Sequence, residues 1–240
     1  MADQNILTFK RIEKKYMIRP EIYEELRRRM EPYMQVDEYG LSTIANIYYD
    51  TDNFDLIRTS LEKPVYKEKL RLRSYGTPKD KTKVFVEIKK KYDGVVYKRR
   101  VKMPLQTAVH FLEEGIYPSE EDCQILHEID YFLKYYHPKP KLMLAYDRIA
   151  MFGKQDPSFR LTFDEKIRSR WHDLDLRHGT DGVELLPPGT HLMEVKINGA
   201  MPLWLSSILT DLEIYPVSFS KYGEIYKLKC SNNNQGGAKS

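Results

Sequence analysis

The chain has 240 residues, of which 41% are hydrophobic, 12% aromatic and 31% charged. Apolar segments recur along the whole length, which excludes a disordered chain and allows one large all-β or α+β domain, or two small ones. The net charge of +4 comes from 39 basic and 35 acidic residues, so the total does not indicate a nucleic-acid binder and the placement of the two signs matters more.

The two cysteines, Cys123 and Cys230, lie far apart and outside any metal-ligand spacing. Such cysteines are typical of free thiols in a reducing cytosol. The first residues contain no apolar signal core, and no segment approaches the roughly 18 apolar residues that a membrane-spanning helix needs. We therefore expect a cytoplasmic protein without a membrane segment.

Hydrophobic periodicity predicts eight strands and five helices. A strand at residues 8–18 is followed by a helix that opens at Pro20 and carries Arg27, Arg28 and Arg29 near its end. The further strands are expected at residues 43–50, 66–75, 83–92, 94–103, 141–152, 158–170 and 191–198, and the further helices at 53–62, 104–114, 119–137 and 202–213. Asp93-Gly94 is a strong hairpin signal, so the sheet is expected to be antiparallel.

Two segments have no predicted helix or strand. Residues 171–190 end in Pro187-Pro188-Gly189 and give no clear pattern. Residues 232–240 form a polar tail that we expect to be disordered. The remaining chain, residues 1–231, is expected to be a single domain.

Charged residues gather on one face of the predicted strands, because side chains alternate between the two faces of a strand. In KEKLRLRS, for example, Lys67, Lys69, Arg71 and Arg73 alternate with apolar residues such as Leu70. These faces carry fourteen basic residues against five acidic ones, whereas the whole chain is near one to one. The charged members are Arg11, Glu13, Lys15, Asp50, Lys67, Lys69, Arg71, Arg73, Glu87, Lys89, Lys98, Arg100, Lys102, Arg148, Arg160, Asp164, Lys166, Glu194 and Lys196.

Two interpretations of this charged face remain open. An ordinary sheet with one solvated face also alternates, but such a face mixes the signs, because like charges opposite each other destabilise strand pairing. A barrel that binds an anion explains the excess of basic residues better. Arginine forks and lysine point charges both suit phosphate oxygens, so the expected anion is a phosphate chain.

Three glutamates stand among these basic residues. A carboxylate would repel phosphate unless a cation lies between them, so Glu13, Glu87 and Glu194 are expected to hold Mn²⁺ or Mg²⁺. The alternative for each glutamate is an internal salt bridge with a neighbouring basic residue.

The order of several short motifs resembles the VTC (vacuolar transporter chaperone) domain of polyphosphate polymerases, which belongs to the triphosphate tunnel metalloenzymes. The resemblance covers roughly residues 8 to 228. It implies an α+β fold in which an antiparallel eight-stranded β-barrel, the triphosphate tunnel, carries its helices on the outside. The motifs are RIEKKYMI, KLRLRSY, VFVEIKKK followed by YKRRVKMPL, LAYDRIAM, FRLTFDEKI, LMEVKING and PVSFSKYG.

The resemblance also implies an activity, namely transfer of the γ-phosphate of ATP to a growing inorganic polyphosphate chain with a divalent metal. Glu194 would bind the metal, and Tyr146 and Ser220 would add hydrogen bonds to phosphate. We expect five residues to form the catalytic group and their side chains to point into one shared lumen. These residues are Arg71, Arg73, Arg148, Arg160 and Lys196. The resemblance also implies that phosphate is bound by Lys15, Lys89, Arg100 and Lys221. The charged strand faces add Lys69 and Lys98 to this phosphate-binding group.

The sequence departs from the family pattern at two positions. Ser218 stands where the fungal motif has a lysine, and Arg11 stands where tunnel phosphohydrolases have the first glutamate of Glu-x-Glu-x-Lys. The second departure favours a polymerase. The alternatives are a phosphohydrolase of tripolyphosphate or nucleoside triphosphates with the same fold, and a non-catalytic polyphosphate-binding module. No nucleic-acid partner is expected, since aromatic residues are sparse among these basic side chains.

Overall fold

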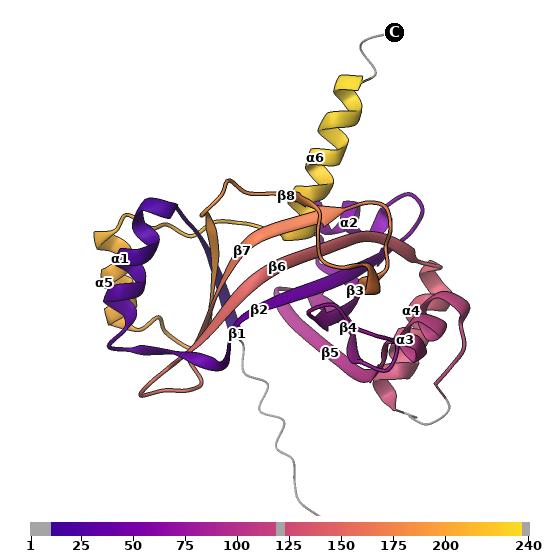
Figure 1. The fold of residues 1–240 in the computed structure, drawn as a ribbon, viewed down its shortest axis with the longest axis horizontal. Coiled ribbons are helices and arrows are strands. Elements are labelled where there is room, and N and C mark those ends of the chain that lie inside the picture. Colours follow the sequence, from indigo (N-terminus) through magenta and orange to yellow (C-terminus); the bar gives the residue numbers. More distant parts are fainter. Residues whose placement is uncertain (1–10, 119–122, 237–240) are drawn as a thin grey trace, which may run out of the picture. The chain divides into compact units, whose positions relative to one another are not determined.

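A computed structural model describes residues 11–118 and 123–236 of the protein (Figure 1). Those residues form nine strands, six α-helices and one 3₁₀-helix, an α+β fold as predicted. The strands are β1 (Arg11–Ile18), β2 (Met34–Asp50), β3 (Tyr66–Tyr75), β4 (Lys83–Tyr92), β5 (Val95–Pro104), β6 (Lys139–Gly153), β7 (Arg160–Arg170), β8 (Val183–Glu184) and β9 (His191–Asn198). The helices are α1 (Pro20–Met30), α2 (Asp55–Leu61), α3 (Leu105–Glu114), α4 (Gln124–Tyr136), η1 (Leu176–His178), α5 (Leu203–Asp211) and α6 (Lys221–Gly236).

The strands belong to one sheet with the order β1-β9-β7-β6-β2-β3-β4-β5, and the short strand β8 pairs with β7. The pairs β1–β9, β2–β3, β3–β4, β4–β5 and β7–β9 are antiparallel, as expected. The prediction of a closed eight-stranded barrel is wrong, because closure requires hydrogen bonds between the two end strands. Among the described residues, the sheet is open at β1 and β5, and it has nine strands.

The chain divides into two compact units. The first unit takes the residues up to Leu41, Arg148–Lys166 and Pro187–Ser218, and the second takes Ser42–Asp147, Ile167–Leu186 and the residues from Phe219 onward. The long strands β2, β6 and β7 contribute residues to both units. The single domain of residues 1–231 stays a prediction.

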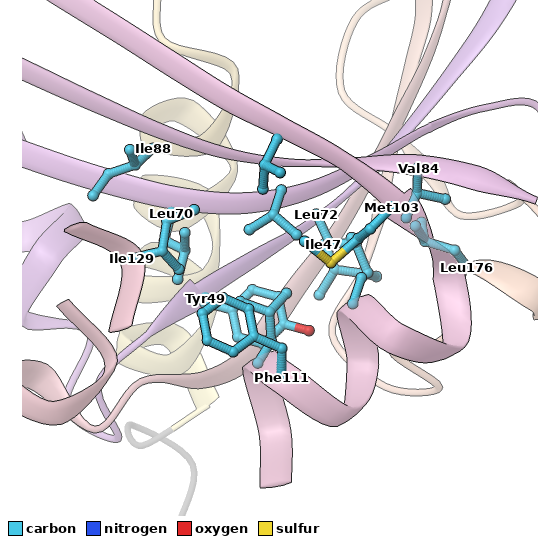
Figure 2. Packing of buried hydrophobic residues seen from close by; sticks show 14 of the residues in the cluster. Ile47, Tyr49, Leu70, Leu72, Val84, Ile88, Met103, Phe111, Ile129 and Leu176 are labelled. Atoms are coloured by element: carbon cyan, nitrogen blue, oxygen red, sulfur yellow. The ribbon is translucent and has the colours of Figure 1, made fainter. Parts of the chain in front are cut away.

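In the second unit, the apolar faces of β2 to β5 are buried beneath α3 and α4 (Figure 2). Leu70 and Leu72 on β3 pack with Val86 and Ile88 on β4, and all four are at most 2% exposed. Phe111 on α3 belongs to the same cluster (Figure 2). Each such side chain contributes about 1.5–3 kcal/mol on burial. The predicted alternation is confirmed here, and it leaves the opposite face of the strands to the charged residues.

The first unit has its own apolar cluster, built from β1, β7, β9, α1 and α5. Tyr16 on β1 and Val195 on β9 are buried in it together with Leu26 on α1. An ion pair between Arg29 and Asp211, 2.6 Å apart, joins α1 to α5. The apolar residues of β1, β7 and β9 therefore face the helices, while the intervening residues form a second charged face.

The five predicted helices are present, but the sequence did not predict α6. Residues 232–236 of the predicted disordered tail belong to this helix, whereas residues 237–240 lie outside the described residues. The predicted first residues of the strand at 8–18 and of the helix at 119–137 also lie outside them. None of the described helices is both long enough and apolar enough to cross a membrane.

The segment 171–190, which has no clear sequence pattern, is ordered around Arg170. This side chain is 5% exposed, and its guanidinium donates to the backbone carbonyls of Asp173, Asp175, Gly179 and Asp181. Hydrogen bonds to backbone carbonyls hold the segment together with the burial of Leu176, and neither produces a hydrophobic period in the sequence.

Candidate functional site

The charged face of the second unit consists of side chains in register on β3, β4 and β5. Arg71 lies opposite Glu87, which lies opposite Arg100, and this row continues to Tyr48 on β2. The rows on either side contain Lys69, Lys89 and Lys98, and Arg73, Phe85 and Lys102. A last row, toward the β4–β5 hairpin, pairs Lys67 with Lys91.

These rows carry nine basic residues and a single acidic residue, Glu87. Along β3 they extend from Lys67 to Arg73, which is about 20 Å at the rise of a β-strand. Lysines that face lysines across neighbouring strands destabilise the sheet. An anion bound along this face would offset the repulsion between these basic side chains.

Glu87 is 1% exposed and binds three basic side chains. Arg71 Nε donates to Glu87 Oε2 over 2.7 Å, and Lys98 Nζ lies 2.9 Å from Glu87 Oε1. Arg73 Nε is 3.8 Å from Glu87 Oε2. Burial alone would raise the pKa of Glu87, but Arg71, Arg73 and Lys98 lower it to about 2. The carboxylate is therefore ionised throughout the working pH range.

Hydrogen bonds to neutral acceptors hold the two arginines of β3. Arg71 Nη1 donates to the hydroxyl of Tyr48 over 3.0 Å. Arg73 Nε donates to Asn46 Oδ1 over 2.9 Å, and its Nη2 donates to the hydroxyl of Tyr146 over 3.1 Å. Both guanidinium groups therefore have fixed orientations and keep further N–H groups for a ligand.

Two groups on this face have pKa values near physiological pH. Burial alone would raise the pKa of Tyr48, but the charges of Arg71 and Lys69 lower it to about 8. Burial lowers the pKa of Lys98, and although Glu87 opposes this, Arg71 lowers it further, to about 8. The positive charge of the face therefore decreases as the pH rises through this value.

The start of α6 belongs to the same unit and brings the predicted residue Lys221 to Tyr146. Lys221 Nζ lies 4.7 Å from the ring centroid of Tyr146. The Ser220 hydroxyl accepts a hydrogen bond from the backbone N–H of Gly223, so it caps the helix. The buried hydroxyl of Tyr222 donates to Asp50 over 2.9 Å, which fixes α6 against β2.

The first unit carries a different charged face, in which the two signs are nearly balanced. Its basic residues are Lys15, Arg148, Arg160 and Lys196, and its acidic residues are Glu13, Asp164 and Glu194. Across β1, β9 and β7, one row contains Glu13, Lys196 and Arg160, and the next contains Lys15, Glu194 and Thr162.

Glu194 is the most enclosed glutamate of this second face, at 8% exposure. Its Oε1 lies 3.5 Å from Lys15 Nζ, and its Oε2 lies 3.5 Å from Arg148 Nη2. Lys15 Nζ also lies 3.4 Å from Glu13 Oε1, so one ammonium group stands between the two glutamates. Arg148 makes two parallel hydrogen bonds, of 2.5 and 2.7 Å, to the fully buried Asp164.

Glu13 and Glu194 are the carboxylates of this face expected to hold a hard divalent cation, and Lys15 Nζ, which lies between them, would have to move aside for it. Such a cation takes oxygen ligands, and Mg²⁺ often uses only one or two carboxylates together with waters and substrate phosphates. Thr162, opposite Glu194, has a buried Oγ1 with no hydrogen-bond partner among the described residues, so one more oxygen is available here. No cluster of three or more His, Cys, Asp or Glu side chains suited to a metal occurs in the described part of the chain.

The predicted residues thus fall into two groups, one in each unit. The second unit assembles Arg71, Arg73, Lys98, Tyr146 and Lys221 through the contacts above. Lys69, Lys89 and Arg100 share its rows, and Lys89 and Arg100 are exposed. The first unit assembles Lys15, Glu13, Glu194 and Arg148, with Arg160 and Lys196 in the neighbouring row. The shared lumen was expected inside a closed barrel, which the open sheet of the described residues does not form. The roles of both groups toward phosphate stay predictions.

Sequence reasoning did not select Asn46, Tyr48 and Asp164 as site residues, although they occupied the expected faces. Each contacts a predicted arginine: Asn46 binds Arg73, Tyr48 binds Arg71 and Asp164 binds Arg148. The strand alternation alone places Asn46, Tyr48 and Asp164 on the charged faces, but it does not show that each of them contacts an arginine. The side chain of Arg11 lies outside the described residues.

Solved structures with a related fold come from several organisms. A Bacillus halodurans protein, described as a candidate adenylate cyclase, is 18% identical and has a TM-score of 0.55, covering 88% of this chain and 95% of its own. A Vibrio parahaemolyticus protein with the same description is 11% identical, with a TM-score of 0.49 and coverages of 90% and 97%. A Hippeastrum protein, whose description reports a dominant triphosphatase activity, is 14% identical, with a TM-score of 0.49 and coverages of 88% and 93%. No curated protein matches this sequence.

The Bacillus halodurans structure, at a TM-score of 0.55, shows that the two proteins share a fold. The sequence model of the VTC domain matches residues 10–229. The chain therefore belongs to the VTC domain family, which confirms the resemblance seen in its motifs.

Proposed function

We propose that the protein is a metal-dependent polyphosphate polymerase that transfers the γ-phosphate of ATP to a growing inorganic polyphosphate chain. The observation that supports this proposal is the set of rows on β3, β4 and β5, with nine basic residues and one acidic residue over about 20 Å. This charge exceeds that of one triphosphate, and a longer chain neutralises it better.

The basic residues would act by position and charge. Phosphoryl transfer demands little covalent chemistry from a protein, since placement of an in-line nucleophile and neutralisation of the phosphate charge are sufficient. In this proposal, the end of the polyphosphate chain is the nucleophile. The side chains that contact the reacting phosphates are Arg71, Arg73, Arg148, Arg160 and Lys196, and those that bind the rest of the chain are Lys15, Lys69, Lys89, Lys98, Arg100, Tyr146, Ser220 and Lys221.

Glu194, together with Glu13, would hold Mn²⁺ or Mg²⁺. When bound, the metal supplies neutralisation of the charge between the transferred phosphoryl group and the leaving ADP. The carboxylates themselves bind the cation and keep Lys15 and Arg148 oriented. ATP as the donor fits the cytoplasmic location predicted from the sequence.

The proposal is tested by incubating the protein with ATP and Mn²⁺, and separately with Mg²⁺, and resolving the products on a polyphosphate gel. The expected product is a ladder of chains longer than tripolyphosphate, formed only with metal. Free phosphate without a ladder would identify a phosphohydrolase. Binding of polyphosphate without turnover, across several divalent metals, would identify a binding module.

A further inference from the structure

Glu87 has none of the surroundings of a metal ligand. Both of its oxygens face cations, since Oε2 lies 2.6 Å from Arg71 Nη2 and Oε1 lies 2.9 Å from Lys98 Nζ. It is the one acidic residue in the four rows, and no group of three or more His, Cys, Asp or Glu side chains suited to a metal occurs among the described residues. A divalent cation at this position would stand among three positive charges, which repel it.

We propose that Glu87 is a positioning residue, which fixes Arg71, Arg73 and Lys98 for anion binding, in place of the metal ligand expected from the sequence. Arg71 and Arg73 lie two residues apart on the same face of β3, so their charges repel each other. The buried carboxylate between them and Lys98 offsets that repulsion and sets the direction of each side chain.

The geometry leaves the arginines available for a ligand while it fixes them. A guanidinium carries five N–H groups. Arg71 directs Nε and Nη2 to Glu87 and Nη1 to Tyr48, and Arg73 directs Nε to Asn46 and Nη2 to Tyr146. At least two N–H groups of each arginine remain, enough for the paired hydrogen bonds with which arginine recognises phosphate.

Charge and positioning predict opposite results for the substitution Glu87→Gln. The variant has one more positive charge, so electrostatics alone predicts tighter binding of an anion. If Glu87 positions the three basic side chains, its loss removes the charge that holds them together and lets them separate, so binding weakens in spite of the added charge. The sign of the change therefore distinguishes a positioning carboxylate from a mere neighbouring charge.

The test is calorimetry with tripolyphosphate in the absence of divalent metal, at constant salt, on the parent protein and on Glu87→Gln. Glu68→Gln is the matched control, because Glu68 pairs with Lys90 and Tyr136, outside these rows, and its loss adds the same charge. We expect about tenfold weaker binding for Glu87→Gln and no weakening for Glu68→Gln. Unchanged or tighter binding by Glu87→Gln would overturn the inference.

Two further measurements keep the inference testable. If circular dichroism shows that Glu87→Gln does not fold, Tyr48→Phe takes its place, because it removes one acceptor of Arg71 with little change in packing. It should weaken tripolyphosphate binding several-fold, and unchanged binding would overturn the inference. In the folded variant, the Mn²⁺ concentration for half-maximal turnover should stay that of the parent, whereas a tenfold rise would assign Glu87 to the metal.

This inference rests on the proposed anion site, and the two fail in different ways. A parent protein that does not bind tripolyphosphate would overturn both the proposed function and the role of Glu87. A parent protein that binds it, with equal binding by Glu87→Gln, would overturn the role of Glu87 alone.

Discussion

Arg71 on β3 lies directly opposite Glu87 on β4, and its Nε donates a hydrogen bond to Glu87 Oε2 over 2.7 Å. The same guanidinium reaches Tyr48 on the other neighbouring strand. Burial lowers the pKa of Arg71, but Tyr48 and Glu87 outweigh this and raise it, so the side chain is always charged. Arg71 is therefore a fixed cation at the centre of the basic rows.

Replacement of Arg71 by alanine should weaken tripolyphosphate binding ten- to a hundredfold, because a charge-assisted hydrogen bond contributes roughly 1.5–3 kcal/mol. Calorimetry measures the change directly. Arg28→Ala is the control, since Arg28 is exposed and pairs with Glu25 on the same helix, α1. Equal affinities of the parent and Arg71→Ala would exclude Arg71 from the phosphate site.

Lys91 tests whether the rows bind a chain longer than a triphosphate. It lies in the last row, about 20 Å along the strands from the row of Arg73. Lys91→Ala should weaken the binding of long-chain polyphosphate several-fold but leave tripolyphosphate binding unchanged. Both affinities should fall as salt rises, because exposed ion pairs are screened.

The control for Lys91 is Lys134→Ala, on α4, where the lysine pairs with Asp130. A comparison of polyphosphate chains of increasing length, from tripolyphosphate upward, gives the chain length at which the bound anion reaches the row of Lys67 and Lys91. If Lys91→Ala and Lys134→Ala bind long chains equally well, the anion does not extend to the β4–β5 hairpin.

Glu194→Gln separates metal binding from salt bridging. The variant keeps the size of the side chain and its hydrogen bonding, but it removes the charge that a hard divalent cation requires. A metal ligand predicts normal folding, retained polyphosphate binding and loss of ATP-dependent turnover. Melting temperature, affinity and product formation should be measured on one preparation, with Glu184→Gln, exposed on β8, as the control.

A different result for Glu194→Gln would change the assignment of the metal site. If turnover is intact and the melting temperature is lower, Glu194 serves only Lys15 and Arg148, and the metal is bound elsewhere.

The strand faces could be predicted from the sequence because burial dictates them. Leu70 and Leu72 are buried, so Arg71 and Arg73 must lie on the other face, whatever the neighbouring strands are. The register was not predictable, because alternation does not tell which residue lies opposite Arg71. The finding that Glu87 lies there, with three basic side chains around it, needed the structure.

Neither the open ends of the sheet nor the helix α6 could be predicted from the sequence. The sequence of a strand indicates which of its faces is apolar, but it does not indicate whether the two end strands of the sheet pair. The open sheet from β1 to β5 therefore has no signal in the sequence. The helix α6 buries Tyr222 and Ile225 but few other residues, and Asn232 with its neighbours favours loops, so its helical period is weak.

Anion affinity should depend on pH. The pKa values of Tyr48 and Lys98 are both lowered to about 8. Loss of the Tyr48 proton adds a negative charge and loss of the Lys98 proton removes a positive one, so each lowers the net charge of the face by one. Tripolyphosphate affinity should therefore fall as the pH rises through about 8, and binding should be accompanied by proton uptake. Tyr48→Phe should make this fall shallower, because only Lys98 then titrates. An affinity that does not change between pH 7 and 9 would contradict the charge arrangement described for this face.

The fate of the ATP γ-phosphate tests the central proposal most directly. ADP and free phosphate should be quantified in one reaction with Mn²⁺ and a short polyphosphate primer. A polymerase predicts ADP in large excess over free phosphate, with the missing phosphate recovered in longer chains, and Glu194→Gln should abolish both signals. Equal amounts of ADP and free phosphate, with no longer chains, would contradict the proposal.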